Sequence, residues 1–145
     1  MSTPSEAHLC SVLVVDDDAE VRELLRVALE AEGYHVDGVH DGREALNHLR
    51  SHADTCIILL DLMLPIMDGV HFRTVQLRDR SLAWIPVILM SGAPDADRRA
   101  SEMDVRRLIR KPLDLDEVKQ ALRFVGCCQA RPRRLAGTTP AGPSE

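Results

Sequence analysis

Two short apolar runs in this chain each end in acidic residues, and they constrain the fold more than any other feature. The first run, residues 12–15, leads directly into three aspartates at 16–18, and the second run, residues 57–60, leads directly into Asp61. Both runs are uninterrupted and rich in branched aliphatic side chains, which is typical of strands buried on both faces of a sheet. If these strands are parallel neighbours, their carboxyl ends bring the aspartates together at one sheet edge.

A group of carboxylates at one sheet edge needs electrostatic compensation. Like charges in water-poor surroundings repel one another and raise some of the pKa values within the group. A hard cation such as Mg²⁺, which prefers oxygen ligands, makes the group tolerable. The sequence therefore predicts a metal site at the carboxyl ends of these two strands.

The rest of the chain alternates strands with helices. The apolar pattern predicts strands near 10–15, 34–39, 56–60, 85–90 and 105–109, each followed by a helix. Leu24 is expected on the inner face of the first helix and Ala53 on that of the second, because both match the helical period. Five strand–helix units predict an α/β fold, a doubly wound five-stranded parallel sheet of order 2-1-3-4-5 with five helices, flavodoxin-like.

Ionisable and hydroxyl side chains gather at the predicted strand ends. These residues are Asp16, Asp17, Asp61, Ser91 and Lys111. In doubly wound sheets the functional crevice lies beyond the carboxyl ends of the strands. The five residues therefore define the candidate functional site.

Four motifs surround these residues in order, namely VVDDD, LLDLMLPIMDG, ILMSGA and IRKPL. With them, residues 10–126 resemble the receiver domain of bacterial two-component response regulators, of the stand-alone type. Each motif alone has modest specificity, whereas four in order at suitable spacing are specific. Residues 1–9 are then an N-terminal extension, and residues 127–145, which lack an apolar period, are expected to form a disordered tail.

The resemblance implies a phosphorylation site at the acidic strand ends. Asp61 is the implied phosphoacceptor, because a carboxylate can attack a phosphoryl group and hold it as an acyl phosphate. Asp17 is the implied direct ligand of Mg²⁺ and Asp16 binds it through water, together with Asp61 and the backbone carbonyl of Met63. Asp18 is expected only to cap the following helix.

The resemblance also assigns roles to the later motifs. Ser91 is implied to hydrogen-bond a phosphoryl oxygen, and the small Gly92 leaves room for the phosphoryl group. Lys111 is implied to pair with the acceptor and its phosphate, aimed inward by a cis bond to Pro112. Leu108 stands where the family usually has Tyr or Phe. Ser91 and Leu108 are therefore the predicted switch positions, in a chain without the usual aromatic ring.

The function implied by the resemblance is a phosphorylation-dependent signalling switch and not an enzyme. Its phosphodonor is a sensor histidine kinase or a histidine phosphotransfer protein, and it signals to a downstream protein by contact. One alternative is a receiver-like interaction module without phosphorylation control, which Leu108 favours. A second is a phosphatase of the haloacid dehalogenase type, because Asp16-x-Asp18 after an apolar strand fits its opening motif, although Ala19 and the lack of a later acidic motif do not.

Composition limits the binding partners and the cellular compartment that we expect for this protein. The net charge of -5 argues against general nucleic-acid binding, and too few residues follow the receiver segment to predict a DNA-binding domain. The chain has neither an apolar stretch long enough for a membrane span nor the pattern of a signal peptide. Cys10 and Cys56 lie at the starts of apolar strands and are expected to be buried free thiols. Free thiols are typical of a reducing compartment, so we expect a cytoplasmic protein. Its expected cofactor is Mg²⁺, bound by the acidic residues.

Overall fold

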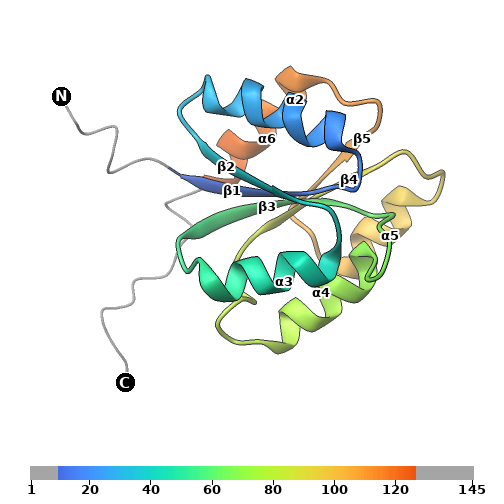
Figure 1. Cartoon of the computed structure of the whole chain (residues 1–145). Helices are drawn as coiled ribbons and strands as arrows, with labels where there is room; N and C mark the ends of the chain where they lie inside the picture. The colour runs from blue at the N-terminus through green and yellow to red at the C-terminus, as the bar shows by residue number, and fades with distance from the viewer. Residues whose placement is uncertain (1–9, 127–145) are drawn as a thin grey trace.

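The computed structural model describes residues 10–126 and contains a parallel five-stranded sheet between two layers of helices (Figure 1). The strands are β1 (Ser11–Val15), β2 (His35–Val39), β3 (Thr55–Asp61), β4 (Val87–Ser91) and β5 (Arg107–Arg110). The helices are α2 (Ala19–Glu30), α3 (Gly42–Ser51), α4 (Gly69–Arg78), α5 (Ala96–Met103) and α6 (Leu115–Val125). The predicted N-terminal extension and disordered tail lie outside the described residues.

The strand order is β2-β1-β3-β4-β5 with every neighbouring pair parallel, which confirms the predicted doubly wound sheet. Val15 at the end of β1 pairs with Leu60, next to Asp61. Asp61 in turn pairs with Met90, the residue before Ser91. The register therefore brings the acidic ends of β1 and β3 and the hydroxyl end of β4 to one edge of the sheet.

Alternate residues of the central strands feed two separate hydrophobic clusters. Val12 and Val14 of β1 pack in the cluster formed with α2 and α6. Leu13 and Val15 pack in the cluster formed with α3, α4 and α5. The same division is visible in Figure 1, where α2 and α6 lie on one face of the sheet and α3, α4 and α5 lie on the other.

Burial of the strands explains the uninterrupted apolar runs of the sequence. Every residue of β1, β3 and β4 is buried, whereas the edge strands β2 and β5 mix buried and exposed positions. Strands covered on both faces need apolar side chains at every position, and edge strands do not. Within residues 10–126, no helix combines the length and the hydrophobicity that crossing a membrane requires.

An aspartate stands at the start of all five described helices, and in four of them its side chain caps the helix. In these four helices a carboxylate oxygen of the first residue accepts a backbone N–H from the first turn, at Asp18, Asp41, Asp68 and Asp114. The role predicted for Asp18 is thereby confirmed. Helix α5 differs, because Asp95 at its start makes no such side-chain cap bond.

Some predictions of local structure were wrong in detail. Leu24 is 47% exposed, whereas Leu25 and Leu29 are the buried residues of α2 and Val21 packs against the same cluster. Ala53 is exposed and lies beyond the end of α3 at Ser51. Strands β4 and β5 begin two residues later than predicted. Pro86 has no backbone N–H to donate to a neighbouring strand, which is consistent with β4 starting at Val87, directly after it.

Candidate functional site

The carboxyl ends of β1 and β3 hold a compact group of three aspartates. Asp16 and Asp61 are buried, at 0% and 5% exposed, whereas Asp17 is exposed to solvent. One carboxylate oxygen from each lies within 4.8 Å of the other two. Among the described residues, this is the one group of acidic, histidine or cysteine side chains that gathers three candidate metal ligands so closely.

Lys111 links the two buried aspartates. Its Nζ atom donates to Asp16 Oδ2 at 2.7 Å and to Asp61 Oδ2 at 3.2 Å. The backbone N–H of Lys111 donates to the carbonyl of Ser91 at 3.1 Å, which attaches the end of β5 to the end of β4. The peptide bond between Lys111 and Pro112 is cis, as predicted. Three strands thus contribute charged groups to one small volume.

The electrostatics of this group leave negative charge in excess. Burial, and then the charge of Asp16, raise the pKa of Asp61 above the usual aspartate value, although Lys111 acts in the opposite direction. Burial alone would lower the pKa of Lys111, but its hydrogen bond to Asp16 and the two carboxylate charges raise it. The site contains one ammonium group and three carboxylates, so negative charge remains uncompensated. A cation that prefers oxygen ligands would compensate this charge and could be bound by the carboxylates.

Ser91 lies at the end of β4 and is 2% exposed. Its Oγ accepts the backbone N–H of Ala93 at 3.0 Å, which leaves the hydroxyl hydrogen available for donation. A side chain built on the intervening Gly92 would meet Lys111 at 3.6 Å. The hydroxyl and the lysine are therefore brought to the same edge as the acidic group.

The loop between β3 and α4 packs tightly against the phosphoacceptor candidate. The backbone N–H of Met63 lies 3.4 Å from Asp61 Oδ1, and the side chain of Met63 is 68% exposed. A Cβ on Gly69 would lie 2.7 Å from the backbone oxygen of Asp61, so only glycine fits there. Ile66 adopts a left-handed backbone with φ 66° and is 75% exposed. The carbonyl of Met63 as a metal ligand stays a prediction.

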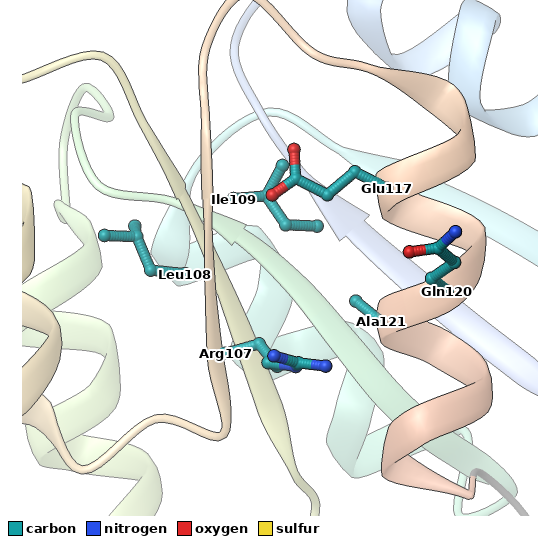
Figure 2. Close-up of a pocket in the computed structure, with 6 residues that line it drawn as sticks. All are labelled: Arg107, Leu108, Ile109, Glu117, Gln120 and Ala121. Carbon is teal, nitrogen blue, oxygen red and sulfur yellow. The ribbon is translucent and has the colours of Figure 1, made fainter.

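The second predicted switch residue, Leu108, is half-buried on β5 and packs against the cluster on the α3–α5 face. Figure 2 shows Leu108 on the side of β5 away from α6, and Arg107 on the side of α6. There the guanidinium of Arg107 lies 4.1 Å from the ring centre of the exposed Phe124. Between β5 and α6 lies a groove of about 160 Å³ lined also by Glu117 and Gln120. A leucine at position 108 thus occupies the inner side of the strand.

A buried polar network centred on Arg73 of α4 was not predicted from the sequence. Its guanidinium is buried and donates to the carbonyls of Met103 at 2.9 Å and Asp104 at 2.6 Å, at the end of α5. It also donates to Gln76 Oε1 at 2.7 Å. Burial lowers the pKa of Arg73, and the charge of Asp104 opposes that effect. The signal in the sequence was the spacing of Phe72, Arg73 and Gln76, which puts two polar residues on an inward helix face.

The fold and the acidic group together define an α/β domain with an acidic site at the carboxyl edge of its parallel sheet, and comparisons with known proteins identify its family. Residues 12–123 match the model of the response regulator receiver domain. The chain belongs to the response regulator receiver domain family, a family of two-component signalling and not of enzymes, as predicted.

Curated relatives support the same family. The chain is 34% identical over 114 residues to the response regulator MprA of Mycobacterium avium, covering 77% of this chain and 49% of the relative. It is 30% identical over 110 residues to the alkaline phosphatase synthesis transcriptional regulatory protein SphR of Synechococcus elongatus, covering 70% and 42%. The chain thus spans about half the length of these curated relatives.

Solved structures share the fold. A putative response regulator from Chloroflexus aurantiacus superimposes with a TM-score of 0.76 at 24% identity, covering 81% of this chain and 97% of that one. The signal receiver domain of a histidine kinase from Syntrophus aciditrophicus gives a TM-score of 0.72 at 29% identity, covering 92% and 99%.

Proposed function

We propose that this chain is a phosphorylation-dependent signalling switch in which Asp61 accepts a phosphoryl group. The observation that carries the proposal is the bridge from Lys111 Nζ to Asp61 Oδ2 and Asp16 Oδ2, beside a third carboxylate within 4.8 Å. A buried carboxylate with a fixed cation beside it is suited to act as a nucleophile toward a charged phosphoryl group. Membership of the receiver family supports this function over the phosphatase alternative.

Mg²⁺ is the proposed cofactor. The carboxylates of Asp16, Asp17 and Asp61 and the carbonyl of Met63 would hold it, because all are the hard oxygen donors that Mg²⁺ prefers. The ion would neutralise negative charge on the phosphoryl group during transfer.

The chain's own residues supply the nucleophile and hold the product. An Asp61 carboxylate oxygen forms a bond to phosphorus, while the bond from phosphorus to the donor histidine nitrogen breaks and its electron pair returns to the imidazole. Lys111 pairs with the phosphoryl oxygens in place of its present contact with Asp61. The Ser91 hydroxyl donates to another phosphoryl oxygen, because the backbone N–H of Ala93 uses a lone pair of its oxygen and leaves its hydrogen available.

The proposed output is a shift in the face built by α5, β5 and α6. Phosphorylation adds charge at Asp61 that Ser91 and Lys111 engage, and their movement biases two pre-existing arrangements of this face. Reversing a 1:99 population requires about 5.5 kcal/mol of differential stabilisation. Because Leu108 has no ring whose rotamer follows Ser91, we propose a smaller shift than an aromatic residue gives.

The proposed phosphodonor is a sensor histidine kinase or a histidine phosphotransfer protein, and the proposed output is contact with a downstream protein in the cytoplasm. The half-buried Leu108 also favours a second candidate, a receiver-like module that binds its partner without phosphorylation control. Signalling that Asp61→Asn leaves unchanged would support this second candidate.

The experiment is phosphorylation of the purified chain by acetyl phosphate and Mg²⁺, followed by intact mass spectrometry. Wild type should gain one phosphoryl group, which chelation of Mg²⁺ should prevent. Asp61→Asn should gain none, whereas the matched variant Asp18→Asn should behave as wild type, because Asp18 only caps α2. An unmodified wild type, or an equal adduct on Asp61→Asn, would refute the proposal.

A further inference from the structure

Histidine and aspartate side chains gather at the opposite end of the sheet, on edge strand β2. His35 pairs with Ser11 at the start of β1, so this end is remote from the acidic group. His35 and Asp37 are two residues apart on the strand and share a face. Asp37 Oδ2 lies 3.3 Å from His35 Nε2 and 3.3 Å from His48 Nε2 of α3. One carboxylate oxygen is thus shared by imidazole nitrogens from two elements.

His48 is held in place by its neighbours. Its side chain is 15% exposed, and its ring stacks on that of His52 with centres 4.0 Å apart and planes at 7°. The Nδ1 atom of His52 lies 3.0 Å from the backbone oxygen of His48. Burial, and then the charge of His52, lower the pKa of His48. The ring is therefore more readily neutral, which is the form that binds metals.

These donors match the chemistry of zinc. A tetrahedral zinc ion has bonds of 2.0–2.2 Å to imidazole nitrogen and carboxylate oxygen, which sets its ligand atoms about 3.3 Å apart. Both separations at Asp37 Oδ2 have this value. We propose that His35 Nε2, Asp37 Oδ2 and His48 Nε2 bind a divalent transition metal ion such as Zn²⁺, with His52 positioning the ring of His48.

Binding requires a modest adjustment of the side chains. Among the described residues, only the acidic group already gathers three ligand atoms within 4.8 Å, so the two imidazoles must approach each other around Asp37. The side chains of His35 and Asp37 are 52% and 38% exposed, which leaves them free to rotate. The bound ion would then join the edge strand β2 to α3. The site is independent of phosphorylation at Asp61.

The test is a calorimetric titration of the full chain with Zn²⁺ in excess Mg²⁺, which occupies the acidic group. Cys127 and Cys128 are replaced by serine throughout, because their thiols could also bind zinc. We expect one zinc ion per chain, and affinity reduced at least about tenfold in His35→Gln and in Asp37→Asn. The matched control His71→Gln removes an exposed histidine on α4 and should bind as the parent does.

Two further measurements test whether zinc binds at His35, Asp37 and His48 and not at the acidic group. In Asp61→Asn the zinc affinity should be unchanged, which separates this site from the acidic group. In the parent chain, NMR signals of the His35 and His48 rings should shift on adding Zn²⁺ while that of His71 does not, a readout that needs no variant to fold. Absence of saturable binding, or binding by His35→Gln and Asp37→Asn as tight as by the parent, overturns the proposal and leaves two ordinary histidine–aspartate hydrogen bonds.

Discussion

The acidic edge of the sheet and helix α5 use charge in opposite ways. At the acidic edge, Lys111 contacts buried carboxylates 95 and 50 residues away in the chain. Along α5, Arg98 pairs with Asp95 and with Glu102, three and four residues away, at the protein surface. Exposed pairs of this kind contribute about 0–1 kcal/mol, whereas breaking a buried pair costs several. The candidate functional site thus lies where tertiary contacts hold the charged side chains in place. The surface ion pairs along α5 hold this helix less strongly.

The largest effect that sharpens this contrast is expected for Lys111→Met. Without Mg²⁺ it leaves Asp16 and Asp61 buried without their cation, and we expect a loss of about 3 kcal/mol in the free energy of unfolding. Urea denaturation measures it, and Mg²⁺ should restore part of the loss. The control Lys119→Met removes a half-buried lysine whose partner Glu32 is exposed, and should cost less than about 0.5 kcal/mol. Equal losses in both variants would contradict the contrast.

A slightly smaller effect is expected for Arg73→Met, which removes the long-range attachment of α5 to α4. The carbonyls of Met103 and Asp104 lose their donors, at a cost of about 2–3 kcal/mol. Hydrogen exchange should show α5 losing protection before β3 does. The exposed Arg98→Met is the matched control and should change neither stability nor exchange appreciably. Unaltered protection of α5 in Arg73→Met would mean that its own ion pairs suffice.

Asp61→Asn should stabilise the chain when Mg²⁺ is absent. Because the folded-state pKa of Asp61 is raised, its contribution to stability is complete below the ordinary value of 3.8 and is lost as pH rises through the folded pKa. At pH 7 the variant should therefore melt a few degrees higher than wild type, and the difference should vanish toward pH 3. Asp17→Asn, at an exposed position, should change the melting temperature less. A lower melting temperature for Asp61→Asn at pH 7 would show that ionised Asp61 does not destabilise the fold.

The smallest difference concerns the helix starts. Asp114→Ala removes a carboxylate that accepts two backbone N–H groups of α6, and should cost about 1 kcal/mol. Asp95→Ala removes only surface pairs with Arg98 and Arg99, whose side chains are 63% and 40% exposed, and should cost less than about 0.5 kcal/mol. Thermal denaturation of both variants compares the two directly. A larger loss from Asp95→Ala would show that α5 depends on its local charges.

Much of the fold followed from local sequence, because strands buried on both faces need continuous apolar runs. The start of α2 followed from Asp18, which precedes an amphipathic segment and caps it. Leu24 shows the limit of the periodic argument, since an apolar residue at the margin of the inner face can lie in solvent without structural consequence.

The site was predictable to the extent that strand ends meet at one edge. Asp16, Asp61 and Lys111 come together as parallel pairing demands, although no spacing in the sequence sets the distances between them. The contact of Arg73 with α5 could not be predicted from sequence, because its partners there are backbone carbonyls about 30 residues further on. Every residue has a backbone carbonyl, so the sequence does not indicate which carbonyl a buried guanidinium will contact.

The loop beside the phosphoacceptor has a consequence for how this chain can change through mutation. Position 69 is closed to every side chain, because even a methyl group there would collide with the backbone of Asp61. Position 66 is the reverse, since an exposed isoleucine occupies a backbone conformation that glycine or asparagine adopts with less strain. Three residues apart, one position admits no variation and the other holds a residue that glycine or asparagine could replace with less backbone strain. Stability lost elsewhere in the domain could therefore be recovered at Ile66 without touching the reacting groups.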